Sequence, residues 1–178
     1  MTHDKALVTE KLRKWEGFLQ EYELPAWDML PGIELYMDQV IALLTQYLNF
    51  LPREDGADNV TTPAMINNYV KMKVLPPPVK KRYSRVHLAY LIMVCMLKQT
   101  LGIAPVQRIL PCSAPEVQVH AVYDAFVRTH KAVAATFTAQ VRAAAAPVLL
   151  SDESDDSAVG ELILQLSLIH ISEPTRRS

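Results

Sequence analysis

Apolar residues recur at spacings of three and four through most of this 178-residue chain, and prolines lie between the resulting segments. The first stripe consists of Val8, Leu12, Trp15, Leu19 and Tyr22. This spacing places the side chains on one face of an α-helix, and no segment shows the alternation of a half-buried strand. The sequence therefore predicts an all-α protein, with helices over residues 4–23, 33–51, 63–72, 85–101, 104–110 and 113–146.

Residues that favour helix ends lie at several of these boundaries. Thr62 is expected to be an N-cap, followed by a proline at the first helical position, where its missing N–H costs nothing. The prolines at 76–78 should end that helix, and Ser84 should cap the next one. Ser113 lies three residues before a glutamate, which is the spacing of a capping box. Pro147 is expected to end the long helix.

Composition sets the class of protein. Half of the residues are hydrophobic, which is enough for one packed domain with tails. Cys95 and Cys112 show neither disulfide nor zinc-site spacing, and Cys95 is expected to be a buried, reduced thiol. The chain does not open with a signal-peptide pattern, and its apolar runs of about ten residues are too short to span a bilayer. We therefore expect a cytoplasmic protein without a membrane segment, a metal or another cofactor.

The charged residues are segregated along the chain, although the formal net charge is only −1. The 57 residues Asn59–Pro115 contain no Asp or Glu but carry eight lysines and arginines, six of them within residues 71–85. By contrast, residues 1–58 hold 11 acidic and 5 basic residues, and residues 116–178 hold 8 and 5. A field of one sign over a short segment attracts polyanions, so this segregation indicates a nucleic-acid reader.

The expected helices around this basic segment have the order of a helix-turn-helix. In that motif the second helix places its outward side chains in the major groove of DNA, while neighbouring groups contact phosphates. Asn67 and Asn68 lie on the outward face of the helix over 63–72, and an asparagine amide can pair bidentately with adenine. The cations that come after this helix could neutralise phosphates. The alternative is a solvated helix face beside a solvated basic loop, which the complete absence of acidic residues disfavours.

Several motifs resemble the winged-helix DNA-binding domain of MerR-type transcription regulators. They are Thr62-Pro-Ala-Met-Ile-Asn-Asn-Tyr-Val-Lys71, Leu75-Pro-Pro-Pro78, Arg82-Tyr83 and Leu101-Gly-Ile103. The resemblance covers about residues 33–110 and implies a MerR-like winged helix-turn-helix core in which Asn67 takes a position that meets DNA. The chain departs from the pattern at Lys73, where those regulators have a helix-stopping glycine, and at Asn67, where they have an arginine. The resulting set of expected DNA-binding residues is Thr62, Ala64, Asn67, Asn68, Lys71, Lys73, Lys80, Lys81, Arg82, Tyr83 and Arg85.

A more specific resemblance is to an uncharacterised bacterial family, domain of unknown function 1836. The shared motifs lie at Leu24–Trp27, Leu35–Val40, Met65–Lys71 and Lys80–Arg85. This resemblance spans most of residues 24–110. It implies a fold grouping but brings no activity.

The regions outside residues 33–110 have separate interpretations. Residues 1–32 are expected to form a helix and a connector, residues 148–165 an acidic disordered tail, and residues 166–178 resemble a translated sequencing-adaptor peptide. The long helix over residues 113–147 carries a near-heptad apolar seam from Val119 to Val141. The seam is compatible with a homodimer, as in MerR-type regulators, or with packing back onto the first helix.

These observations predict a sequence-specific double-stranded DNA-binding transcription regulator, with its effector unknown. The alternative is a protein–protein adaptor that uses the basic surface and the long helix. The chain lacks the phosphate-binding, GxSxG and HExxH motifs, so we do not expect an enzyme. Glu116, His120 and Asp124 share one helix face, which supplies two metal ligands at most, and we interpret them as solvated. His130 lies on the apolar seam and is interpreted as an interface residue.

Overall fold

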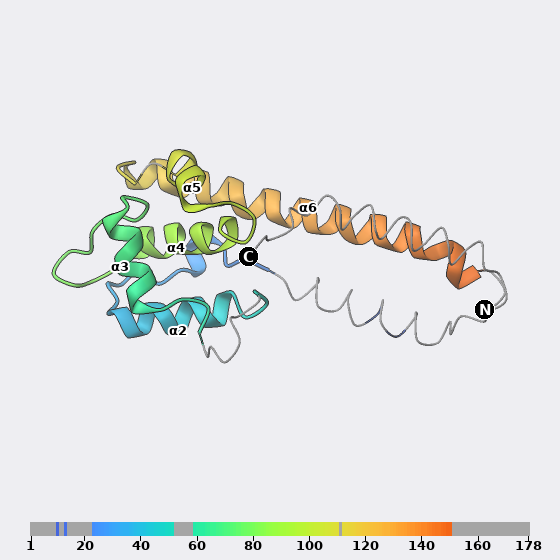
Figure 1. Ribbon diagram of the computed structural model, residues 1–178, viewed down its shortest axis with the longest axis horizontal. Coiled ribbons are helices and arrows are strands. Elements are labelled where there is room, and N and C mark those ends of the chain that lie inside the picture. The colour runs from blue at the N-terminus through green and yellow to red at the C-terminus, as the bar shows by residue number, and fades with distance from the viewer. Residues whose placement is uncertain (1–9, 11–12, 14–22, 52–58, 111, 151–178) are drawn as a thin grey trace. The chain divides into compact units, whose positions relative to one another are not determined.

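The computed structural model describes residues 10, 13, 23–51, 59–110 and 112–150. Its regular elements are η1 (Trp27–Met29), α2 (Met37–Tyr47), α3 (Pro63–Lys71), α4 (Arg85–Leu97), α5 (Ile103–Ile109) and α6 (Glu116–Leu150) (Figure 1). Within the described ranges the fold is all-α, as predicted, and β-pairing is limited to two isolated bridges. The expected helix over residues 4–23 falls almost entirely outside these ranges, as does the chain beyond residue 150.

The chain divides into two compact units. One consists of residues 24–129, which we call the core unit, and the other combines residues 1–23 with 130–178. In the second unit, Lys131 Nζ lies 2.7 Å from Glu23 Oε1, and this hydrogen bond lowers the pKa of the Glu23 carboxyl. The core unit contains the whole basic segment, so it holds every residue expected to bind DNA.

Helix α4 forms the centre of the core unit. It lies between α2 and α5 in Figure 1, and every residue from His87 to Cys95 is buried. A helix that is apolar all round is typical of a core position, whereas a single buried face was expected from the sequence. Burial raises the pKa of the Cys95 thiol to about 12, so this cysteine remains protonated at neutral pH, as expected for a structural thiol.

The start of α2 is delayed by a backbone pairing with a distant segment. Leu35 and Tyr83 exchange two hydrogen bonds, each with an N···O distance of 2.8 Å, in an antiparallel bridge. A residue held in this extended pairing cannot take helical dihedral angles. The helix therefore begins at Met37, and the predicted start at Ile33 is wrong.

Two predicted helix caps are confirmed. The Met65 N–H donates to Thr62 Oγ1 over 3.2 Å, and Ser84 occupies the N-cap position of α4. Other predicted ends are wrong. Helix α6 begins at Glu116, so Ser113 lies before its first turn, and α6 continues through Pro147 to Leu150. A proline removes one backbone hydrogen bond, and this can bend a long helix without ending it.

Two further predicted ends lie beyond the helices as observed. Helix α2 ends at Tyr47 rather than at residue 51, and α4 ends at Leu97 rather than at residue 101. After α4, the N–H groups of Gln99 and Thr100 bond to carbonyls only three residues earlier. Such bonds tighten the last turn of a helix, so the path of the chain continues after the α-helix has ended.

Trp27 of the connector is a packing centre of the core unit. It is 5% exposed and stacks on the His120 ring at a centroid distance of 4.4 Å, with Tyr123 edge-on at 6.0 Å. The Tyr123 hydroxyl donates to the Pro25 carbonyl over 2.8 Å. Aromatic pairs of this kind add to the free energy of burial, so they hold the connector against the first turns of α6.

His87 joins the start of α4 to the proline-rich segment. The Ser84 N–H donates to His87 Nδ1 over 3.0 Å, and His87 Nε2 lies 3.4 Å from the Pro77 carbonyl oxygen. Nδ1 must therefore be the unprotonated nitrogen, and Nε2 carries the hydrogen. Burial lowers the pKa of His87, and the contact with Pro77 opposes this shift only in part.

This arrangement predicts a loss of stability in mild acid. The unfolded chain binds a proton at His87 near the ordinary pKa of about 6.5, whereas the folded chain resists protonation to lower pH. The free energy of unfolding should thus be highest above this pH and fall as the pH drops below it. In His87→Gln the fall should be smaller, because glutamine at this position keeps an acceptor for the Ser84 N–H but does not titrate.

Urea unfolding of the wild type and of His87→Gln at a series of pH values between 5 and 8 measures the effect. The free energy of unfolding is plotted against pH for both proteins. The difference between the two slopes gives the contribution of His87 apart from that of the other histidines. Equal slopes would contradict the assignment.

Candidate nucleic-acid interface

Helix α3 presents a polar face opposite its buried one. Ile66 and Tyr69 are buried in the core unit, whereas Asn67 and Asn68 are exposed. Ala64 and Lys71 are also exposed, so the outward residues form a stripe along the helix. The face carries two side-chain amides, and each amide offers both donors and an acceptor.

The end of α3 places a lysine in the left-handed region of backbone space. Lys73 has φ 55°, the Val74 N–H bonds to the Tyr69 carbonyl at 2.9 Å, and the Lys73 N–H bonds to the Val70 carbonyl at 3.0 Å. These two bonds define a Schellman motif, in which glycine usually takes the position of Lys73. The chain therefore ends the helix as a glycine would, and it keeps a charged side chain at that point.

The segment between α3 and α4 ends in a tight turn that carries two more left-handed lysines. Val79 and Arg82 exchange backbone hydrogen bonds of 3.1 and 2.9 Å, and between them Lys80 has φ 49° and Lys81 has φ 62°. Positive φ at both central residues is the signature of a type I′ turn, for which Asn-Gly is the preferred sequence. We call residues 79–82 the basic turn, and the loop that contains it projects beyond the helices in Figure 1.

Arg82 is held by a residue that no sequence motif indicated. Its Nη2 donates to the Tyr36 hydroxyl over 2.8 Å, and its guanidinium carbon lies 4.6 Å from the centre of the Tyr36 ring. Tyr36 is 52% exposed and precedes α2 directly. It is 46 residues away from Arg82 along the chain, so no local pattern could have paired them. Tyr36 therefore joins the candidate interface as the residue that orients Arg82.

Three of the expected DNA-binding residues have other contacts. The Tyr83 side chain is buried, 2% exposed, so it belongs to the core rather than to the surface. Arg85 is half-buried with its guanidinium carbon 5.8 Å from the Trp27 ring centre, and its Nε is buried without a hydrogen-bond partner among the described residues. Thr62 is exposed, but its hydroxyl oxygen accepts the capping bond of α3.

The lysines of the interface have no acidic partners in the described part of the chain. Lys71, Lys73, Lys80 and Lys81 are exposed and form no ion pair with any described residue. Lys98 differs, because its ammonium group donates to the Tyr69 hydroxyl over 3.1 Å. The interface thus combines the α3 stripe, Lys73, the basic turn and Tyr36, and its four lysines are exposed.

The histidine and carboxylate on the first turns of α6 form a surface pair. His120 Nε2 lies 3.2 Å from Asp124 Oδ2, one helical turn away, and both side chains are about 40% exposed (43% and 39%). Among the described residues, no three His, Cys, Asp or Glu side chains gather where they could hold a metal ion. Over the same residues, no helix has the length and apolar character of a membrane span.

The fold defines the protein as a helical domain with an exposed basic turn. The chain belongs to the family described as Domain of unknown function (DUF1836), which matches residues 25–126. That range covers most of the core unit, including α3, the basic turn and α4. Neither the curated proteins nor the solved structures contain a match to the chain.

At the lysines with positive φ, glycine should stabilise the fold, although it would remove a positive charge from the candidate interface. A residue with a Cβ at positive φ is strained by about 1 kcal/mol relative to glycine. Lys81→Gly and Lys73→Gly should each raise the free energy of unfolding by about 0.5–1 kcal/mol, after allowance for the greater freedom of glycine in the unfolded chain.

Lys71→Gly is the matched control, because Lys71 has helical geometry in the last turn of α3. There glycine should lower the free energy of unfolding, by up to about 1 kcal/mol. Urea denaturation measures all three variants. Destabilisation by Lys81→Gly as large as that by Lys71→Gly would show that the basic turn is not strained.

Proposed function

We propose that the core unit binds double-stranded DNA in a sequence-specific manner and that the protein is a transcription regulator. In this proposal α3 enters the major groove as the recognition helix, and the basic turn is the wing of a MerR-like winged helix-turn-helix. The observation that carries the proposal is the set of four exposed lysines without acidic partners among the described residues, beside the amide face of α3.

The dimensions of α3 support the major groove as its site. An α-helix with its side chains is about 10–12 Å wide, and the major groove of B-DNA is about 12 Å wide. Asn67 and Asn68 are consecutive and both exposed, so an edge of a base pair can be reached from this face. A bidentate bond from an asparagine amide to adenine discriminates against other bases by about 1–3 kcal/mol.

The basic turn supports phosphate contacts. Lys80 and Lys81 occupy the tip of a hydrogen-bonded turn, so their Cα positions are fixed while their ammonium groups remain in solvent. Arg82 is already ordered on Tyr36, which reduces the entropy lost when the guanidinium binds an anion. A strained backbone that is retained where charge is exposed is typical of a functional site.

A homodimer through residues 113–147 belongs to the same proposal. Two copies would double the phosphate contacts and read two half-sites. Val133, on the predicted seam of α6, is 61% exposed and can contribute to such an interface. Val141 and Ala145 are already buried within one chain, so the dimer contact would use other parts of the helix.

The first test concerns base recognition. Selection of duplexes from a random pool should enrich a single motif, and a palindromic motif would indicate binding as a dimer. The double variant Asn67→Ala, Asn68→Ala should bind the enriched duplex at least tenfold more weakly, because the base contacts are lost. Its affinity for unrelated duplexes should change little, since phosphate contacts remain. Equal binding of all duplexes by the wild type, unaffected by the double variant, would overturn base recognition.

The second test concerns the basic turn. Lys80→Gln with Lys81→Gln should weaken binding to all duplexes alike and reduce the slope of log K against log salt by about 1.8, or about 0.9 for each lost phosphate contact. Arg108→Gln, in α5, removes one exposed charge outside the candidate interface and is the control; it should leave the affinity and the slope unchanged. Fluorescence anisotropy at several salt concentrations measures the slope. An unchanged slope would remove the basic turn from the interface, and binding of acidic polypeptide but not of DNA would favour the adaptor function instead.

A further inference from the structure

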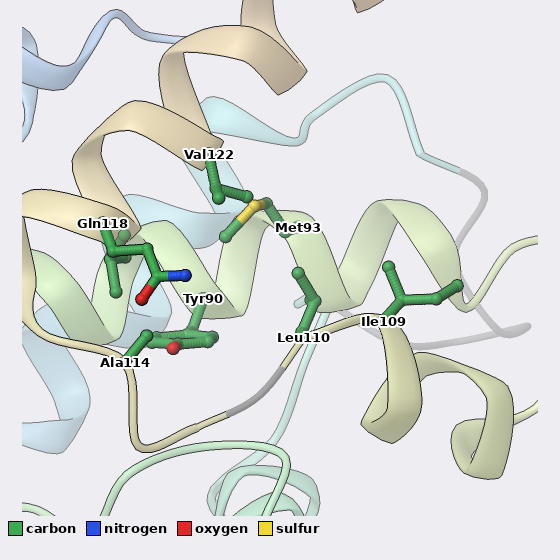
Figure 2. A pocket seen from close by; sticks show the side chains of 8 residues that line it. Tyr90, Met93, Ile109, Leu110, Ala114, Gln118 and Val122 are labelled. Carbon is green, nitrogen blue, oxygen red and sulfur yellow. The ribbon is translucent and has the colours of Figure 1, made fainter.

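A second candidate site lies on α4, α5 and α6 of the core unit. A cavity of about 220 Å³ has walls from Tyr90 and Met93 of α4, the end of α5, and the first turns of α6. Figure 2 shows the side chains that line it. The hollow is open to solvent on one side, because Ile109, Gln118 and Val122 among its lining residues are exposed. An apolar cavity of about 150 Å³ can hold benzene, so the hollow has room for a small molecule.

The side chains that line the cavity determine which kind of molecule could bind in it. No charged side chain lines the cavity, and most of the lining is hydrocarbon. The Tyr90 ring forms one wall, and the Met93 thioether forms another, so an aromatic ring would meet two favourable surfaces (Figure 2). The exposed Gln118 carboxamide also lines the cavity and can both donate and accept hydrogen bonds.

The rim gives access from solvent and limits the size of the occupant. Ile109 is 55% exposed and Val122 is 44% exposed, so both belong to the mouth of the cavity. Sites for drug-sized ligands usually measure about 300–1,000 Å³, and an apolar cavity of about 150 Å³ accepts benzene. The volume therefore suits one aromatic ring with a short substituent.

We propose that this cavity is a binding site for a small, uncharged, monocyclic aromatic molecule that carries one polar group. The ring packs between Tyr90 and Met93, and the polar group reaches the Gln118 amide. A carboxylate or an ammonium group is disfavoured, because no lining side chain offers it a counter-charge and its ion–water contacts would hold it at the open rim. This site shares no residue with the candidate DNA interface, and its occupancy can be tested without DNA.

The test titrates the full chain with benzyl alcohol and toluene as neutral probes and with benzoate and benzylammonium as charged ones. Ligand-detected NMR and thermal shift should give saturable binding of the neutral probes with a Kd of about 1 mM or tighter, which is within reach of ligands of this size. The charged probes should bind more weakly, because the lining offers them no counter-charge.

Two variants identify the site. Val122→Trp fills the mouth and should weaken both neutral probes at least tenfold, whereas Val117→Trp is its matched control, since Val117 lies on the same helix, is 82% exposed and does not line the cavity. Gln118→Leu should weaken benzyl alcohol but not toluene, because only the alcohol uses the amide. Far-ultraviolet circular dichroism and urea unfolding establish that each variant is folded.

Three results would overturn the proposal. They are the absence of saturable binding of either neutral probe up to about 10 mM, equal binding of benzoate, and equal losses in Val122→Trp and Val117→Trp. Self-association of the wild type that Val122→Trp abolishes would show that a second copy of the chain covers this hollow, and that result also overturns the ligand site.

Discussion

The backbone pairing of Leu35 with Tyr83 is the contact on which the candidate interface depends. It joins Leu35, two residues before α2, to Tyr83, two residues before α4, and the side chains of both residues are buried. Because neighbouring side chains in extended backbone point to opposite sides, burial of Leu35 and Tyr83 leaves Tyr36 and Arg82 pointing outward. The stacked pair of Tyr36 and Arg82 is thus a direct consequence of two hydrogen bonds in the core.

Charge and backbone strain coincide in the segment after α3. The non-glycine residues with positive φ in the described part of the chain are Lys73, Lys80 and Lys81. Glycine would relieve each of these positions but would remove a cation from the surface. The coincidence of charge and strain at these positions supports the DNA-binding proposal.

Helix α5 stands between the two candidate sites. Its Gln107 Nε2 donates to the Met72 carbonyl over 2.8 Å, so it is tied to the residue that caps the C-terminal end of α3. Two residues further on, Ile109 contributes to the mouth of the apolar cavity. One short helix therefore contacts the C-terminal end of α3 and lines the proposed ligand site.

Local signals in the sequence were sufficient for several features. The apolar spacing predicted all-α structure, Thr62 and Ser84 were recognisable as caps, and the absence of acidic residues located the basic surface. Each of these depends on residues within one or two helical turns, so the pattern is visible along the chain. The family match over residues 25–126 agrees with the resemblance found from short motifs.

By itself, the sequence determined the all-α class, the caps at Thr62 and Ser84, and the sign of the charge around α3. Only the tertiary structure decided that Tyr83 and much of Arg85 serve packing, that Tyr36 orients Arg82, that the turn at Lys80 and Lys81 is left-handed, and that a cavity lies beside Tyr90. The physical reason is distance along the chain: Leu35 meets Tyr83, and Trp27 meets Arg85 and His120, through contacts that no local spacing encodes. Burial and orientation depend on these partners, whereas helix formation depends mainly on neighbours in sequence.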